Sequence, residues 1–205
     1  MKYLEYKLTD NAGGETISIP IPESYKDCGR LIQSDYYRRC KAIKPIWKIY
    51  LKTLYNPCIA VQFWARVSAY ETGLFYKFSR FCLRHYRLRY GISFNSRRVG
   101  YGLYIGHEYL QVNPCTVIGN NVNISQFTTI GTNTKHGAII GNNIYIGPSV
   151  CIVEGVNIGS HVTIGAGTIV VKDLQKDSTY VGNPARRVGE NRHPEFIRNP
   201  WPLNS

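Results

Sequence analysis

The sequence predicts a mainly β protein, a parallel β-helix built from hexapeptide repeats, with a small α-helical domain before it. Two observations lead to this prediction. The first is a basic, aromatic and glycine-poor region with helical spacing at residues 31–90. The second is a series of aliphatic residues six positions apart, at Ile140, Ile146, Ile152, Ile158, Ile164 and Val170.

The six-residue period identifies the fold because no simple helix or strand repeats in this way. A helix repeats its apolar residues every 3.6 positions and a half-buried strand every two, which an ordinary β-sandwich would also show. The unit reads aliphatic, Gly, polar, polar, small or β-branched, polar, as in "IGNNVN" and "IGSHVT". Each unit supplies one short strand and a corner, and stacked coils bury a continuous aliphatic ladder. This repeat predicts a parallel β-helix over residues 91–185.

The region before the repeats predicts four helices. Pro45 and Pro57 fit helix starts and not helix interiors, because proline lacks the backbone N–H and clashes with the preceding turn. Gly73 separates a fourth helical segment, "LFYKFSRFCLRHYRLRY", from the rest. The first three helices are expected near residues 31–42, 45–55 and 57–70.

The two ends of the chain lack such patterns. Residues 1–30 contain Gly13, Gly14 and two prolines without clear periodicity, so we expect an irregular arm with a short strand at "ETISI". Residues 186–205 are expected to form a C-terminal tail. The first residues carry charges throughout and do not read as a signal peptide.

Composition limits the classes of function. No apolar run approaches the roughly 18 residues of a membrane span. The six cysteines are dispersed without a C-x-x-C pair, which argues against a zinc site and a disulfide framework, so we expect a cytoplasmic protein without a metal. Residues 31–90 hold 12 of the basic residues and two acids, out of a net charge of +12. Such a region attracts anions, but no nucleic-acid-binding motif accompanies it, so no nucleic-acid partner is expected.

Two interruptions of the repeat are candidates for chemistry, since insertions leave a solenoid core intact. They read "GHEYLQVNPCTV" and "GTNTKHGAI", and each contains one histidine, His107 and His136. Histidine is the side chain best suited to accept a proton near neutral pH. Taken alone, either one is better explained as an ordinary surface-loop residue. Because both interrupt neighbouring coils, we predict that they are catalytic.

Several segments resemble the hexapeptide-repeat acyltransferases, in particular serine acetyltransferases and their relatives in surface-polysaccharide gene sets. These segments are "NISQFTTIGT", "IGNNIYIGPSVCIVEGVNIGSHVTIGAGTIVVKD" and "YVGNPARRV". "RLIQSDYYRR" resembles the segment that opens the helical domain, and "GYGLYIGH" resembles the motif with the catalytic histidine. The resemblance covers about residues 30–190. It implies a left-handed β-helix, a homotrimer that sometimes pairs into a dimer of trimers, and active sites between neighbouring subunits.

The resemblance also implies roles for individual residues. Acetyl-CoA would lie along the coils with its thioester near His107, the general base for an acceptor hydroxyl. Backbone N–H groups or a protonated His136 would stabilise the oxyanion. Residues expected along the cofactor are Gly147, Pro148, Ala166 and Gly167, with Lys172, Arg186 and Arg187 near its phosphates; the alternative for the last three is a solvated basic surface. Residues expected beside the acceptor are Asp35, Glu108 and Lys135.

Three departures from the family pattern concern the acceptor. Gly106 stands where serine acetyltransferases have an Asp that contacts the serine amine, and Ile92 or Ser93 stands where a second Asp orients the imidazole. Lys135 replaces an Arg that holds the serine carboxylate, and Lys is a poorer bidentate partner. We therefore expect a neutral hydroxyl acceptor, such as a sugar of a surface-polysaccharide precursor. The alternatives are a serine O-acetyltransferase of cysteine biosynthesis and a non-catalytic scaffold.

The basic helical region also contains 14 aromatic residues between positions 31 and 90. Basic side chains with interfacial aromatics suit a lipid surface, so peripheral membrane contact is one expectation. The alternative, which we favour for most of these aromatics, is that they form the helical core and the contacts between subunits.

Overall fold

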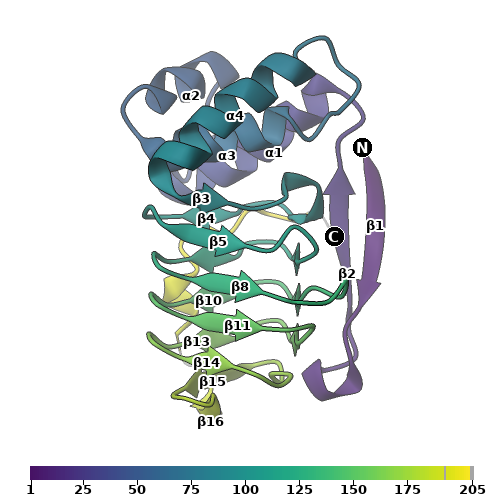
Figure 1. The fold of residues 1–205 in the computed structure, drawn as a ribbon, viewed down its shortest axis with the longest axis vertical. Coiled ribbons are helices and arrows are strands. Elements are labelled where there is room, and N and C mark those ends of the chain that lie inside the picture. Colours follow the sequence, from purple (N-terminus) through teal and green to yellow (C-terminus); the bar gives the residue numbers. More distant parts are fainter. Residues whose placement is uncertain (192, 204–205) are drawn as a thin grey trace.

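The computed structural model describes residues 1–191 and 193–203. A layer of four helices caps one end of a parallel β-solenoid, and both ends of the chain run along the outside of the solenoid (Figure 1). The prediction of a solenoid preceded by helices is therefore confirmed.

The solenoid has three faces, and each turn adds a short strand to them. Face 1 holds five strands, one per turn: β3 (Ile92–Ser93), β5 (Leu110–Val112), β8 (Thr129–Gly131), β11 (Cys151–Val153) and β14 (Ile169–Val170). Face 2 holds β6 (Val117–Ile118), β9 (Ile139–Ile140) and β12 (Asn157–Ile158). Face 3 holds β4 (Tyr104–Ile105), β7 (Asn123–Ile124), β10 (Tyr145–Ile146), β13 (Thr163–Ile164), β15 (Ser178–Val181) and β16 (Arg186–Glu190).

The core is the ladder that the six-residue period predicts. Ile146 pairs in register with Ile124 and Ile164 on the adjacent turns, so like residues stack on like. All six aliphatic residues of the series from Ile140 to Val170 are completely buried. Burying one such side chain contributes about 1.5–3 kcal/mol, so the ladder dominates the stability of this half of the chain.

The edge between face 3 and face 1, here called edge 3/1, is a regular stack of corners. One residue of each corner has a left-handed backbone with φ between +58° and +68°. These residues are Gly91, Tyr109, Phe127, Ser149 and Gly167. Backbone hydrogen bonds join each corner to the next, for example from Phe127 N–H to Tyr109 O at 2.7 Å. Edge 3/1 is therefore a straight, rigid line along the solenoid.

The helices are α1 (Tyr25–Cys40), α2 (Ile46–Thr53), α3 (Pro57–Val67) and α4 (Tyr76–Tyr90). Pro45 precedes α2 and Pro57 opens α3, as expected. The first helix begins earlier than expected, because the Ser24 hydroxyl caps it by accepting the Asp27 N–H at 3.2 Å. Within the described residues, no helix has both the length and the apolar character needed to cross a bilayer.

The helical aromatics divide between core and surface. Phe63 packs in the cluster between α1, α2 and α3, whereas Trp47, Tyr55 and Phe81 are 61%, 85% and 71% exposed. Part of this set therefore builds the helical core, and part forms an uncovered apolar surface on a basic domain. Membrane contact through that surface stays a prediction.

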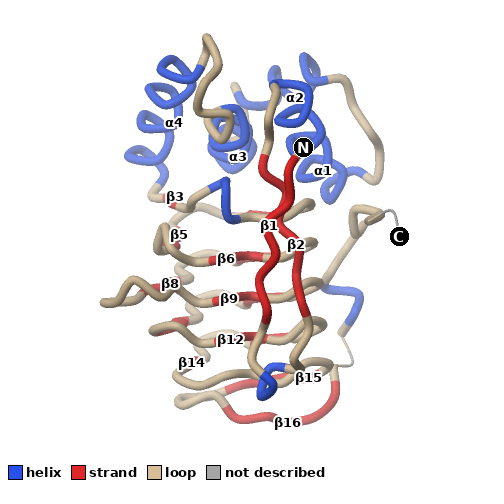
Figure 2. Tube along the Cα trace, turned by 90° about the vertical axis from the view of Figure 1, so that its right-hand side faces the viewer, coloured by secondary structure: helices blue, strands red, loops and turns tan. Residues whose placement is uncertain are grey.

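The N-terminal segment differs from the expected irregular arm. It forms an antiparallel hairpin of β1 (Lys2–Lys7) and β2 (Thr16–Ile21), with a short 3-10 turn, η1 (Asp10–Ala12), between the strands. The hairpin runs along face 2 (Figure 2). Leu8, Ile17 and Ile19 are buried there with Val117. The alternating residues of β2 provide the apolar side that this packing needs.

The C-terminal segment also differs from a free tail. It begins as β16, which pairs with β15, and then returns along face 3 toward the helices through the 3-10 turn η3 (Pro194–Phe196). The ring of Phe196 packs 4.8 Å from that of Tyr145, and Trp201 packs 5.4 Å from Tyr37 of α1. The described ends of the chain thus lie over faces 2 and 3, and face 1 carries neither of them.

Candidate functional site

Edge 3/1 brings together His107 and the residues expected along the cofactor. His107 follows β4 at the upper end of this edge, and its side chain is exposed. Pro148, Ala166 and Gly167 occupy lower corners of the same edge. Gly147 precedes Pro148 in the same corner, and a Cβ added to it would approach Ala166 N of the next corner to 2.9 Å, so only glycine permits this close stacking. Residues from two separate repeats therefore share one line with the histidine.

Two aromatic residues on this edge were missed by the sequence reasoning. Tyr109 and Phe127 stack with their rings 5.7 Å apart and 12° from parallel, and both are more than half exposed. They lie between His107 and Pro148 and form an exposed, flat apolar surface on the edge. The sequence could have indicated them, because each is an aromatic residue at a corner position of the repeat. The backbone there is left-handed, a conformation that Gly or Asn usually adopts.

His136 lies on the other side of face 1, in the loop between β8 and β9. Thr134 Oγ1 accepts the His136 N–H at 3.2 Å, and Thr132 Oγ1 donates to Glu154 Oε2 at 3.1 Å. These contacts order the loop while the histidine stays exposed. His107 and His136 therefore flank face 1 from its two opposite edges and are not neighbours within one chain.

The remaining site candidates are dispersed, and among them only Glu108 is half-buried. Glu108 adjoins His107, and Lys135 adjoins His136. Lys172 follows β14 at the edge between faces 1 and 2, away from edge 3/1. The expectation that Arg187 lies with the cofactor residues also fails, because β16 carries it onto face 3, where its Nε donates to Ser178 Oγ at 2.8 Å. Arg186 is exposed beside Ala185, whose N–H binds Ile169 O at the lower end of edge 3/1.

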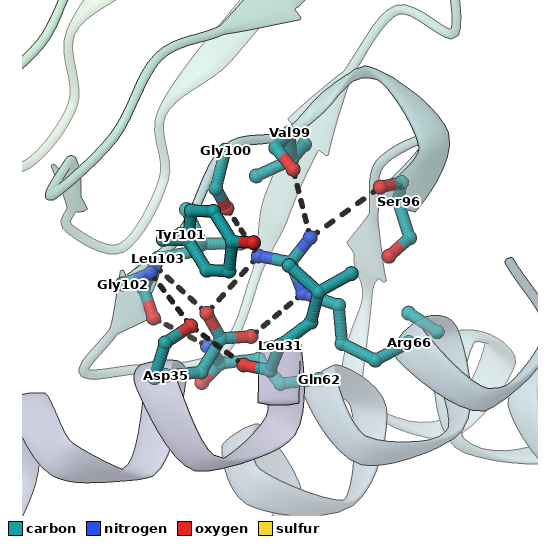
Figure 3. A network of polar contacts seen from close by, with 12 residues as sticks. Leu31, Asp35, Gln62, Arg66, Ser96, Val99, Gly100, Tyr101, Gly102 and Leu103 are labelled. Carbon is teal, nitrogen blue, oxygen red and sulfur yellow. Dashed lines mark hydrogen bonds and ion pairs between the residues drawn. The ribbon is translucent and has the colours of Figure 1, made fainter. Parts of the chain in front are cut away.

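Asp35 does not lie beside an acceptor site, and this corrects the expectation. Its side chain is buried between α1, α3 and the first turn, where Arg66 Nε and Nη2 donate to its two oxygens at 2.8 and 3.0 Å (Figure 3). The Leu103 N–H donates to the same carboxylate at 2.9 Å. Burial raises the pKa of Asp35, and the Arg66 guanidinium opposes that rise. The carboxylate thus joins the helical layer to the solenoid.

The same polar cluster fixes the backbone that leads to His107. Arg66 donates to Val99 O at 2.8 Å and to Gly100 O at 2.6 Å. Arg38 of α1 donates to Gly102 O at 2.7 Å. Donors from two helices therefore satisfy the carbonyls of Val99, Gly100 and Gly102, which are buried in this junction. The segment before His107 is held in one position.

A cation, and not an acid, lies beside the position where the family pattern has an orienting carboxylate. Ser93 lies on β3 opposite Gln111 of β5, and the Arg87 side chain of α4 donates to the Ser93 hydroxyl. Face 1 is hollowed beside these residues, and the hollow of about 480 Å³ reaches Thr132 in the loop of His136. Within the described residues, no cluster of His, Cys, Asp and Glu side chains could hold a metal ion.

The comparisons with known proteins find serine acetyltransferases both by sequence and by structure. No family model matches the chain. It is 35% identical over 103 residues to serine acetyltransferase 3, mitochondrial, of Arabidopsis thaliana, which is 48% of this chain and 26% of that protein. It is 28% identical over 169 residues to serine acetyltransferase of Helicobacter pylori, which is 80% of this chain and 95% of that protein. The chain thus spans about a quarter of the plant relative and nearly all of the bacterial one.

A solved structure supports the same assignment of the fold. The serine acetyltransferase of Brucella abortus strain S19 in complex with coenzyme A matches with a TM-score of 0.65 at 23% identity. The match covers 82% of this chain and 68% of that one. At this identity the match shows the fold. In sequence and in fold the chain is similar to serine acetyltransferases, and its own repeats form a hexapeptide-repeat solenoid.

Proposed function

We propose that the protein is an O-acetyltransferase that moves the acetyl group of acetyl-CoA to an acceptor hydroxyl. The observation that carries this proposal is the alignment of exposed His107 with the stacked corners of edge 3/1. That edge offers a narrow, extended strip along which a long, thin cofactor fits. Pro148, Ala166 and Gly167 form its end farthest from the helices. A stacked aromatic pair lies between these corners and the histidine.

The chemistry follows from the position of His107. As a general base, it takes the proton of the acceptor hydroxyl while the oxygen attacks the thioester carbon. The carbon–sulfur bond then breaks, and His107 returns the proton to the departing thiolate. Backbone N–H groups at the corner, or a protonated His136, stabilise the oxyanion in between. Such base catalysis contributes about 10²–10⁴-fold in rate.

Serine is the acceptor that the comparisons favour, since the relatives and the solved structure described above are named serine acetyltransferases. This replaces our expectation of a neutral sugar as the first choice. A sugar of a surface-polysaccharide precursor stays the second candidate, because Gly106 stands where the family has the carboxylate that contacts the serine amine, and the carboxylate that orients the imidazole is also missing at Ile92 and Ser93.

A homotrimer would complete this site. His107 and His136 lie on opposite edges of face 1, while the chain's own ends lie over faces 2 and 3. In a three-fold assembly, a residue from one edge of a subunit meets the other edge of its neighbour. We therefore propose that His136 acts on the acetyl group bound beside the partner's His107. The non-catalytic alternative requires neither histidine.

Thiol release from acetyl-CoA tests the proposal. Purified protein is assayed with L-serine, with a panel of sugars, and without acceptor. His107→Ala should lower turnover at least about 100-fold. The matched control is His161→Ala, which removes an exposed corner histidine from the edge between faces 2 and 3. Turnover that survives in His107→Ala, or no turnover with any acceptor, would contradict the proposed reaction.

A further inference from the structure

A groove between α4 and the first turn of the solenoid has no assigned role. It encloses about 580 Å³ and opens beside Ser93 and Gln111. Three arginines of α4 line it: Arg80, Arg84 and Arg87. We call this feature the arginine groove. It continues into the hollow on face 1, because Ser93 and Gln111 line both.

The positive charges of the arginine groove are not compensated within the described chain. No carboxylate there lies within ion-pair distance of the three arginines, and nearby Glu71 pairs with Arg97. Arg87 is partly buried and binds only a neutral hydroxyl, that of Ser93. Burial and the charge of Arg80 lower the pKa of Arg87. Converging cations without an acid are the arrangement that a bound anion stabilises.

The place of the groove indicates which ligand would enter it. The cofactor strip of edge 3/1 runs from His107 away from the helices, toward Gly167. The arginine groove lies on the side of His107 that faces the helices, next to β3. This strand follows Gly91, and the Gly91 carbonyl accepts the N–H of Leu110, close to His107 in the sequence. With the cofactor below the histidine, the space above it belongs to the acceptor. This step rests on the proposed function.

We infer that the arginine groove binds an anionic group of the acceptor, a carboxylate or a phosphate. Guanidinium groups bind both anions in a bidentate way, which Lys135 cannot do. Arg87 is a cation beside Ser93, and no carboxylate of the described residues pairs with it, so the local charge favours an anion over an ammonium group. The carboxylate of serine is one source of this chemistry, and an acidic or phosphorylated sugar is another.

Kinetics with charged and neutral acceptors distinguish these sources. L-serine, glucuronate, glucose 6-phosphate and glucose are compared in wild type, Arg87→Gln and Arg84→Gln. Arg84 is exposed, so its replacement keeps the test valid if the half-buried Arg87 is needed for folding. We expect KM for the preferred anionic acceptor to rise about tenfold or more, which corresponds to the loss of one charge-assisted contact, with KM for acetyl-CoA unchanged. The control is Arg89→Gln on the same helix, which stacks on Tyr90 outside the groove.

A binding measurement separates this inference from the proposed reaction. Inorganic phosphate should raise the Tm of wild type, and Arg87→Gln should lose that rise. If phosphate binds in this way but no acceptor is acetylated, the groove stands and the reaction fails. If His107-dependent turnover is as good with glucose as with the anionic acceptors and Arg87→Gln changes neither KM nor the phosphate effect, the groove is refuted.

Discussion

Replacing Asp35 tests whether the junction between helices and solenoid is structural. In Asp35→Ala, the Arg66 guanidinium stays buried and loses both hydrogen bonds to the carboxylate, at 2.8 and 3.0 Å. The Leu103 N–H loses its acceptor as well. Removing one partner of a buried ion pair costs about 3–5 kcal/mol, because the other charge is left uncompensated. That is a large part of the about 5–15 kcal/mol that stabilises a typical domain.

The chain offers a matched control in a second acid–arginine pair. Glu71 and Arg97 form an ion pair in which both side chains are 40% exposed or more. Exposed pairs contribute about 0–1 kcal/mol, so Glu71→Ala should be nearly neutral. A third variant, Asp35→Leu with Arg66→Met, removes both buried charges but also leaves the carbonyls of Val99 and Gly100 without their donor, so we expect it to recover only part of the loss of Asp35→Ala.

Urea unfolding of the full chain measures these differences. Tryptophan fluorescence reports on the junction, because Trp64 lies on α3 and Trp201 packs against Tyr37 of α1. The reasoning is refuted if Asp35→Ala loses no more stability than Glu71→Ala. It is also refuted if Asp35→Ala keeps its stability but raises KM for the acceptor, which is the outcome that a substrate-binding Asp35 would give.

Two further predictions concern the core and the thiols. Ile152→Ala removes a completely buried ladder residue and should cost about 2–5 kcal/mol, measured by the same urea unfolding. Burial raises the pKa of both Cys28 and Cys58 to about 11, so at pH 8 only about one thiol in a thousand is ionised, whereas Cys40 is exposed. Native protein should therefore react with Ellman's reagent at Cys40 well before Cys28 and Cys58, and fast labelling of the buried pair without denaturant would contradict this.

The solenoid could be predicted because its contacts are periodic in the sequence. Ile152 meets Ile130 and Val170 on the adjacent turns, and each of these residues belongs to the same repeat, so a local pattern encodes a long-range contact. The hairpin on face 2 has no such encoding. β2 has the alternating apolar residues of a strand. The hairpin packs on Val117, however, which lies about a hundred residues after β2 in the sequence. No period connects the two.

The site divides in the same way. His107 and the corners of edge 3/1 follow from motif and repeat, and the structure places them on one line. Asp35 was expected beside the acceptor because its segment, "RLIQSDYYRR", resembles the family's helical segment, and that resemblance does not show whether the side chain is buried. Its partner Arg66 lies 31 residues away on another helix, and no spacing rule relates the two.

Arg87 lies beside Ser93 for a local structural reason that the sequence pattern alone does not reveal. Gly91 ends α4 in a left-handed conformation, with φ of +61°, and turns the chain directly into β3. This tight reversal brings the last turn of the helix over the strand that it leads into, so Arg87 reaches Ser93 from six positions earlier. An acid at position 93 would pair with this arginine and cancel its charge. With serine there, the charge of Arg87 remains available to a ligand, which is the condition that the proposed anion-binding groove requires.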